Sequence, residues 1–291
     1  MKRRTTRALT LKKIIQLSAK AVGVFLLTLF LFYMLFPFYY AVIQSLKTQA
    51  QYDMIPITLL PVDPESGNLN ITFQNFQMIF SYPLFLRGLF NSLIVCGIST
   101  AGSLIFGFAA AFALTKYNVK FKQGILSLFL SLMVFPQISL LTGLYGMMRN
   151  LHLTGLPAIT ISYFLITIPF CVWFLRVYLE QSSSEMLEAA RVDGANVFQI
   201  IQFIYIPIMY PAILSTAMFS FITVFNEYLY AVTFSAVDQN SVTANVVIAA
   251  NTPVGPPMYA GIVSVIYPLI IVVTVFQRYI YSTFSITGGN K

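Results

Sequence analysis

The sequence is poor in charged residues for its length. Asp, Glu, Lys and Arg make up only 9% of its 291 residues, whereas 58% are hydrophobic. A soluble domain carries about 25% charged residues, so this shortage excludes an ordinary soluble protein and indicates an integral membrane protein. Six predominantly apolar stretches contain no charged residue, and each exceeds the roughly 20 residues that a helix needs to cross the hydrocarbon core. They are residues 21–46, 88–115, 123–148, 150–175, 194–226 and 239–277.

The apolar stretches are continuous and lack the apolar–polar alternation of a membrane β-barrel. Because backbone groups in lipid must be paired internally, helices are the expected form. The sequence predicts an all-α integral membrane protein, with a basic segment over residues 1–20 and one domain over residues 21–291. Six transmembrane helices and two outer loops are expected. The helices lie at about 21–43, 88–115, 123–148, 153–175, 203–226 and 260–280, and the loops at 47–86 and 227–258.

Positive charge is spread unevenly along the chain. If the N-terminus is cytoplasmic, all but three of the 17 Lys and Arg residues lie on the inner side, the exceptions being Lys47, Arg87 and Arg149. Such a bias sets orientation in membranes, so both termini and the loop over residues 176–202 are expected in the cytoplasm. The bias also explains the net charge of +8 without a nucleic-acid partner. We therefore expect a multi-pass membrane protein.

The basic segment over residues 1–20 allows two interpretations. Leu11, Ile14 and Ile15 share one helical face, which fits a short interfacial helix on the anionic headgroups of membrane lipid. A disordered basic tail is the equal alternative. The apolar run that follows is too long for the core of a secretory signal, so an uncleaved first helix is expected.

Residue types that carry chemistry inside membranes are scarce. The single histidine, His152, falls in a predicted outer turn, and the two cysteines, Cys96 and Cys171, fall inside predicted spans as free apolar thiols. There is no HExxH motif, so no metal or catalytic site is expected, and there is no GxxxxGK[ST] phosphate loop. If ATP drives this protein, its hydrolysis belongs to another chain.

Ion-coupled secondary transporters are the alternative class. They usually carry ionisable groups inside their spans. This chain has none away from the span ends, and the class is kept as the alternative.

Small residues recur at every fourth position in two predicted spans. Small side chains let helices approach closely in lipid, so helix packing is favoured over substrate lining. The two stripes are Ser99, Ser103, Gly107 and Ala111, and Ala212, Thr216 and Ser220. Pro136 and Pro169 each predict a bend, because proline leaves a backbone carbonyl of the helix free.

The loop over residues 176–202 is unusually acidic for the positive side of a membrane. Ser182 and Glu185 have capping-box spacing, which predicts that a helix of good helix formers starts there. Gly194 predicts the end of that helix and a tight turn. Asn196, three residues before a glutamine, repeats the capping pattern and predicts a second helix that continues into the fifth span. The loop is thus expected to be a helix–turn–helix.

The same loop carries a family resemblance. Glu188-Ala189-Ala190, three residues, Gly194, nine residues, Ile204, one residue and Ile206-Pro207 resemble the EAA loop of membrane subunits of binding-protein-dependent ABC importers. Ile206 stands where that consensus has leucine. Further segments resemble the sugar-importer branch, and within it the smaller six-span partner of a maltose-type permease pair. They are Asn91-Ser92, the run from Pro169 to Trp173, Asn226-Glu227-Tyr228, Gln277-Arg278-Tyr279 and Gly288-Gly289.

The resemblance implies a membrane-spanning subunit of an ATP-driven importer of di- or oligosaccharides, located in the bacterial plasma (inner) membrane and forming half of the translocation pathway. The implied partners are a second permease subunit, two ATPase subunits expected as a homodimer, an extracytoplasmic solute-binding protein and a sugar. This chain is expected to bind no cofactor, with ATP and Mg on the ATPase subunits.

In the family, this loop is the coupling helix and sits in a cleft of the ATPase. The resemblance implies that Glu188 pairs with a basic residue of the ATPase, that Ala189 and Ala190 permit close seating, and that Gly194 makes the turn. The complete coupling set is Glu185, Met186, Leu187, Glu188, Ala189, Ala190, Asp193, Gly194, Ala195 and Pro207.

A few polar residues associated with the spans are candidates for the pathway or a gate. They are Gln137, Ser139, Thr223, Asn226 and Glu227. Glu227 borders a span and could hold a proton or an ion, but its place beside Asn226 favours a structural or gate role. The loop after span five resembles the family loop that reaches into the binding protein. Its candidate contacts are Asn245, Asn251, Pro253 and Gly255.

Overall fold

The computed structural model describes residues 2–183, 185–236 and 238–288, without the side chains of residues 2–15, 239 and 280–288. Within these residues the regular structure is helical, apart from one isolated bridge between Val62 and Leu69. The predicted all-α class is confirmed. The apolar face predicted for Leu11, Ile14 and Ile15 and the glycine at position 289 lie outside the described residues.

Five helices are long and apolar enough to cross a membrane, and a bent pair makes up to six. The spanning segments are Gln16–Ser45 within α1 (Lys2–Ser45), α4 (Pro83–Lys116), α7 (Gly155–Gln181), Val197–Phe225 ending in α10 (Ile206–Phe225), and Pro256–Tyr279 within α13 (Pro256–Gly288). Each overlaps a predicted span. α1 continues without a break across residue 20, where a separate basic segment was expected to end. The orientation of the termini stays a prediction.

The span predicted over residues 123–148 is not one continuous helix, and whether the segment crosses the membrane as a single broken span stays a prediction. The structure has two helices there, α5 (Lys122–Val134) and α6 (Gln137–Asn150), and they are bent by 103°. Phe135 is extended, with φ −65° and ψ 135°, because a residue before proline avoids the helical region and Pro136 has no N–H to continue the ladder. The bend predicted at Pro136 is therefore a full break, whereas α7 remains one helix through Pro169.

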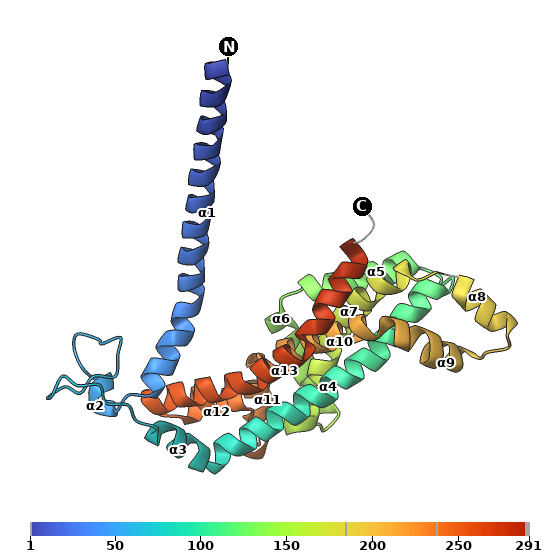
Figure 1. The fold of residues 1–291 in the computed structure, drawn as a ribbon. Helices are drawn as coiled ribbons and strands as arrows, with labels where there is room; N and C mark the ends of the chain where they lie inside the picture. Colours follow the sequence, from blue (N-terminus) through green and yellow to red (C-terminus); the bar gives the residue numbers. More distant parts are fainter. Residues whose placement is uncertain (1, 184, 237, 289–291) are drawn as a thin grey trace. The chain divides into compact units, whose positions relative to one another are not determined.

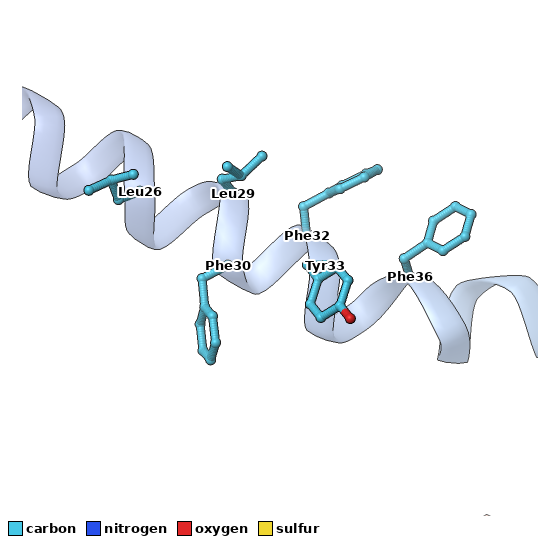
Figure 2. Close-up of a pocket in the computed structure, with 6 residues that line it drawn as sticks. All are labelled: Leu26, Leu29, Phe30, Phe32, Tyr33 and Phe36. Carbon is cyan, nitrogen blue, oxygen red and sulfur yellow. The ribbon is translucent and has the colours of Figure 1, made fainter.

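The described chain forms two compact units, one of residues up to 77 with 254–263, and one of residues 78–253 with 264–288. In the first unit, α1 exposes its side chains over most of its length. A hollow of about 550 Å³ lies along it, lined by Leu26, Leu29, Phe30, Phe32, Tyr33 and Phe36. Figure 2 shows these side chains standing on opposite sides of a single helix. Such a surface suits lipid or another helix rather than a solute.

The end of α1 is fixed by polar contacts within the same unit. The Asn75 amide, on α3 (Gln74–Ser81), donates hydrogen bonds of 2.8 Å to the carbonyl oxygens of Ser45 and Lys47. Lys47 is 1% exposed, and its ammonium donates a 2.6 Å hydrogen bond to the carbonyl oxygen of Thr58. Burial lowers the pKa of Lys47. Together with α2 (Gln49–Tyr52), these contacts order the segment predicted as the first outer loop.

In the second unit, α4 and α7 pack closely along the first small-residue stripe. Ser99 Oγ donates to the carbonyl oxygen of Thr160 at 3.0 Å, and Ser103 Oγ donates to that of Phe164 at 3.1 Å. At Gly107 the helices are so close that a Cβ atom would lie 2.5 Å from Cys171 Cβ. All four stripe residues are buried, so the predicted packing role is confirmed. The second stripe, on α10, is buried as well.

The segment predicted as the second outer loop, over residues 227–258, is largely helical and packed. It contains α11 (Leu229–Ser235), a 3-10 turn (Gln239–Ser241) and α12 (Ala244–Asn251). α12 buries Ala244, Val246 and Val247. The segment is therefore helical rather than irregular, and its position outside the membrane stays a prediction.

Candidate functional site

The helix–turn–helix predicted in the charged loop is present. We call residues 182–205 the α8–α9 arm; it consists of α8 (Glu185–Val192), a turn, α9 (Val197–Ile200) and the π-helix η1 (Ile201–Tyr205), with residue 184 outside the description. Figure 1 shows α8 and α9 projecting from one end of α4 and joining α10. The geometry predicted for this loop is thus confirmed, and its coupling role stays a prediction.

The start of α8 differs from the prediction at Ser182. This residue ends α7, and its Oγ donates a 2.7 Å hydrogen bond to the carbonyl oxygen of Leu179. The neighbouring Ser183 Oγ accepts from the backbone N–H of Glu185 at 3.1 Å. The capping box between Ser182 and Glu185 is therefore wrong, because α7 runs further than the predicted span and uses Ser182 at its own end.

The turn after α8 is a Schellman motif. The N–H of Ala195 donates to the carbonyl oxygen of Ala190 at 3.0 Å, and the N–H of Gly194 donates to that of Arg191 at 3.1 Å. Gly194 has a φ of +82°, a conformation that costs other residues roughly 1–2 kcal/mol. The glycine of the EAA pattern is therefore explained by backbone geometry alone.

The second helix begins with the predicted capping box. Asn196 Oδ1 accepts from the N–H of Gln199, and Gln199 Oε1 accepts from the N–H of Asn196, both at 2.9 Å. At η1 the N–H of Ile206 bonds to the carbonyl oxygen of Ile201, five residues back. Pro207 has no N–H to contribute to the following turn. The junction between the arm and α10 is consequently a π-bulge, a feature often found at functional sites.

The predicted coupling residues divide between two faces of the arm. Leu187 and Ala190 are buried, at 5% and 7% exposure, in a cluster with residues of α4 and α7. Glu185, Glu188 and Ala189 are exposed on the other face, and Asp193 and Gly194 are exposed in the turn. The remaining members are Met186 and Ala195, which are half-buried, and Pro207, which is exposed. The buried pair anchors the arm to its own chain, and the exposed face is left for a partner.

The most exposed apolar residue of each α-helix of the arm was not singled out from the sequence. Val192 is 88% exposed and Phe198 is 73% exposed, one on each helix. The helical spacing of Glu185, Glu188 and Val192 places Val192 on the outward face of α8, and this spacing could have revealed it. Acidic, small and bulky apolar side chains together form a surface typical of protein contacts.

The pathway candidates do not form one polar cluster in the described contacts. Gln137 and Ser139, at the start of α6, and Thr223 and Asn226, at the end of α10, are all exposed. Thr223 and Asn226 donate only to carbonyl oxygens of their own helix. Gln137 lines a hollow of about 260 Å³ with residues of α5, α6 and α7, among them Pro169.

Glu227 has a full set of hydrogen-bond donors. Its carboxylate accepts from the hydroxyl of buried Tyr163 and the N–H of Leu229, each at 2.7 Å, and from the N–H of Tyr230 at 3.1 Å. It thereby caps α11 and ties it to α7. Burial and the Glu227 carboxylate raise the pKa of Tyr230 to about 12, so Tyr230 stays a donor to the carbonyl oxygen of Gln137. These contacts support the structural role over an ion site.

The candidate contacts for a binding protein differ in accessibility. Asn245 is half-buried, and its amide donates a 2.7 Å hydrogen bond to the carbonyl oxygen of Phe225. Asn251 and Pro253 are exposed. Gly255 is buried with a φ of +141°. Asn251 and Pro253 are therefore the accessible members of this set.

The Asn91-Ser92 pair has a structural explanation that the sequence did not supply. The Asn91 amide donates hydrogen bonds of 2.8 Å to the carbonyl oxygens of Asn240 and Val242. Ser92 Oγ accepts from the N–H of Ala244 at 3.0 Å. The pair thus fastens the chain entering α12 to α4.

Comparison with known proteins identifies the family. Residues 103–285 match the family described as "Binding-protein-dependent transport system inner membrane component". The chain belongs to this family. The match contains α7, the α8–α9 arm and α10, and it places the protein in the inner membrane as a multi-pass transport component. Membership supports binding-protein-dependent transport over the ion-coupled alternative.

Individual relatives cover nearly all of this family member. It is 30% identical to the sulfoquinovosyl glycerol transport system permease protein SmoH of Agrobacterium fabrum, over 88% of this chain and 89% of that one. It is 30% identical to the trehalose/maltose transport system permease protein MalG of Thermococcus litoralis, over 88% and 90%. A chain in the crystal structure of a bacterial ABC transporter involved in importing the acidic polysaccharide alginate superposes with a TM-score of 0.74, at 26% identity, over 89% of this chain and 95% of that one.

Proposed function

We propose that this chain is one of two membrane-spanning subunits of an ATP-driven importer of di- or oligosaccharides. It forms half of the translocation pathway and is moved by a separate cytoplasmic ATPase, which binds ATP and Mg. A second permease subunit, a pair of identical ATPase subunits and an extracytoplasmic binding protein complete the assembly. Family membership supports the transport role, and the sugar transporters among the relatives support the substrate class.

The observation that carries the coupling role is the outward face of the α8–α9 arm. Glu185, Glu188, Ala189 and Val192 are exposed together on a short helix whose opposite face is buried in the chain's own core. An exposed carboxylate beside small and apolar side chains suits a cleft with a basic residue and an apolar wall. The positive-charge bias supports a cytoplasmic position for this face.

The arm is also built to transmit force. A Schellman turn and a capping box hold its two helices, and its second helix leads through η1 into α10. A push on the outward face therefore reaches a transmembrane helix directly. In alternating access, such a movement rocks one bundle against another around a site near the midplane.

Two variants test the coupling role in the assembled transporter. Glu188→Lys reverses the exposed charge, and Gly194→Pro is incompatible with a φ of +82° and removes the N–H bonded to Arg191. We expect both proteins to insert normally, to copurify with less ATPase and to lose at least about tenfold of ATP-driven uptake. Glu65→Lys, the same charge reversal on an exposed residue of the predicted outer segment, is the matched control. Normal ATPase recovery and uptake in both arm variants would contradict the coupling role.

Substrate class is tested separately. The binding protein copurified with the assembly is titrated with trehalose, maltose and unrelated solutes such as amino acids, and uptake of the bound solutes is then measured in proteoliposomes. Saturable binding and uptake of a di- or oligosaccharide is the expected result. Uptake of amino acids with no sugar uptake would overturn the sugar assignment and leave the coupling role intact.

A further inference from the structure

Lys116, the last residue of α4, and Tyr117, which follows it, contact the α8–α9 arm at three points. The Lys116 ammonium donates a 2.8 Å hydrogen bond to the carbonyl oxygen of Ser182, where the chain enters the arm. The same ammonium lies 5.4 Å from the centroid of the Tyr205 ring, where the chain leaves the arm. Next to it, the Tyr117 ring receives the Arg191 guanidinium at 5.2 Å, at the end of α8.

These contacts join residues that are far apart in the sequence. They hold the arm to α4 at a residue before α8 and at a residue after α9. Ser182 precedes α8 and Tyr205 follows α9, so one lysine from α4 spans the entrance and exit of the arm. Tyr205 is fully buried, and its ring packs edge-on against Phe112 of α4 at 5.0 Å. A cation over a desolvated aromatic ring and a hydrogen bond from a charged donor are among the stronger contacts that single side chains make.

We infer that Lys116 and Tyr117 are positioning residues that make the α8–α9 arm and α4 move as one body, so that displacement of the arm is passed to α4 as well as to α10. This inference rests on the proposed coupling function. Neither residue is part of the outward face of the arm, so neither is assigned a contact with the ATPase.

The packing of α4 against α7 explains why this connection matters. The two helices share hydrogen bonds at Ser99 and Ser103 and a contact at Gly107 that leaves no room for a Cβ atom. A helix pair packed this tightly moves as a unit. By holding the arm to α4, the two residues link it to the α4–α7 pair. Without them, the π-bulge at η1 and the chain around Ser182 are the places where the arm can swing independently.

The first experiment measures sugar transported per ATP hydrolysed in proteoliposomes containing the complete assembly. Lys116→Met is expected to lower this ratio by about tenfold while ATPase copurification is unchanged, because it removes both the charged hydrogen bond and the cation over the ring. Lys116→Arg keeps both contacts and is expected to stay within about twofold of the unmodified protein. Lys120→Met is the matched control, since it removes a charge from the same loop at an exposed position. An unchanged ratio in Lys116→Met, or an equal loss in Lys120→Met, would overturn the inference.

A second variant tests single-body motion directly and does not depend on Lys116. Tyr117→Cys combined with Arg191→Cys removes the third contact, and a short bismaleimide then joins the two thiols; the native Cys96 and Cys171 are buried. We expect the unbridged protein to show a reduced transport-to-hydrolysis ratio and the bridged protein to regain it. Arrest of uptake by the bridge would show that the arm moves relative to α4, which contradicts the inference.

The two assignments fail in different ways. If the unmodified chain recovers no ATPase, the coupling function and this inference both fall. If ATPase recovery and the arm variants behave as proposed but Lys116→Met leaves the amount of sugar transported per ATP unchanged, only the positioning role is contradicted.

Discussion

The hydroxyl of Tyr163 donates a 2.7 Å hydrogen bond to the carboxylate of Glu227, joining the middle of α7 to the corner between α10 and α11. Tyr163 is 1% exposed, so its hydroxyl depends on this acceptor. The same carboxylate accepts the first free N–H groups of α11. One acidic side chain therefore fixes the corner at which α10, the continuation of the arm, ends.

Removal of this carboxylate tests the structural role of Glu227. We expect Glu227→Ala to lower the free energy of unfolding by about 2–4 kcal/mol, because it leaves the buried Tyr163 hydroxyl and the α11 N–H groups without their acceptor. Thermal unfolding in detergent is the measurement. Tyr163→Phe is expected to lower the free energy of unfolding by less than Glu227→Ala does. The double variant is expected to lower it by less than the sum of the two single effects.

The conservative variant at the same position separates a cap from an ion site. Glu227→Gln keeps an acceptor for the α11 N–H groups, so ATP-driven uptake in proteoliposomes should stay within about threefold of the unmodified protein. An ion or proton site would instead lose uptake with the charge. Abolished uptake in a Glu227→Gln protein of normal thermal stability would therefore refute the cap assignment.

Two glycines on α4 form a matched pair for the helix contact. A Cβ atom at Gly107 would lie 2.5 Å from Cys171 Cβ, whereas at Gly97 there is open space. Gly107→Ala should force α4 and α7 apart and destabilise the protein by about 1–3 kcal/mol. Gly97→Ala should be neutral or stabilise the helix by up to about 1 kcal/mol. Equal unfolding midpoints for the two variants would show that the small-residue stripe does not set the helix spacing.

The segment between α11 and α12 provides a pH test. Hydrogen bonds from the Ser241 hydroxyl and the Asn240 N–H, together with the Arg87 guanidinium, lower the pKa of Asp238. A carboxyl group whose pKa is lower in the folded state stabilises above its unfolded pKa of about 4, and this contribution disappears as the pH falls through the folded pKa.

The comparison of Asp238→Asn with the unmodified protein isolates this group. The variant should unfold at a lower temperature near pH 6, and this difference in unfolding temperature should narrow as the pH falls through the folded pKa of Asp238, where the native carboxyl becomes protonated. Glu65→Gln, an exposed acidic residue, is the control. A difference in unfolding temperature that stays constant as the pH is lowered would mean that the charge of Asp238 does not contribute to stability.

The features that the sequence predicted correctly are local ones. Gly194 and the Asn196–Gln199 capping box act within a few residues, and their geometry in the structure matches the prediction. The small-residue stripes follow the period of one helix, so their packing role could be predicted without knowing which helix lies against them. The pattern around Ser182 failed because the length of α7 decides which serine caps which helix, and that length depends on packing.

The features that escaped prediction are those that join distant segments. Lys116 meets Ser182 and Tyr205 only after α4, α7 and α10 have packed, and no spacing in the sequence brings them together. The division of the arm into Leu187 and Ala190 inside and Glu188 and Ala189 outside depends on the same packing. The sequence predicted only a bend at Pro136, where the structure has a full break. A proline indicates that a helix is interrupted, but the angle depends on the packing of the surrounding helices.

The most direct test of the central claim uses two adjacent alanines of the arm. Ala189 is exposed and Ala190 is 7% exposed. Cysteines at these neighbouring positions therefore differ mainly in whether the side chain faces outward or toward the chain's own core. Each variant is labelled with a thiol-reactive photocrosslinker in the complete assembly and illuminated. The coupling role predicts a crosslink to the ATPase from Ala189→Cys and little or none from Ala190→Cys. No ATPase crosslink from Ala189→Cys, in an assembly that still takes up sugar, would contradict it.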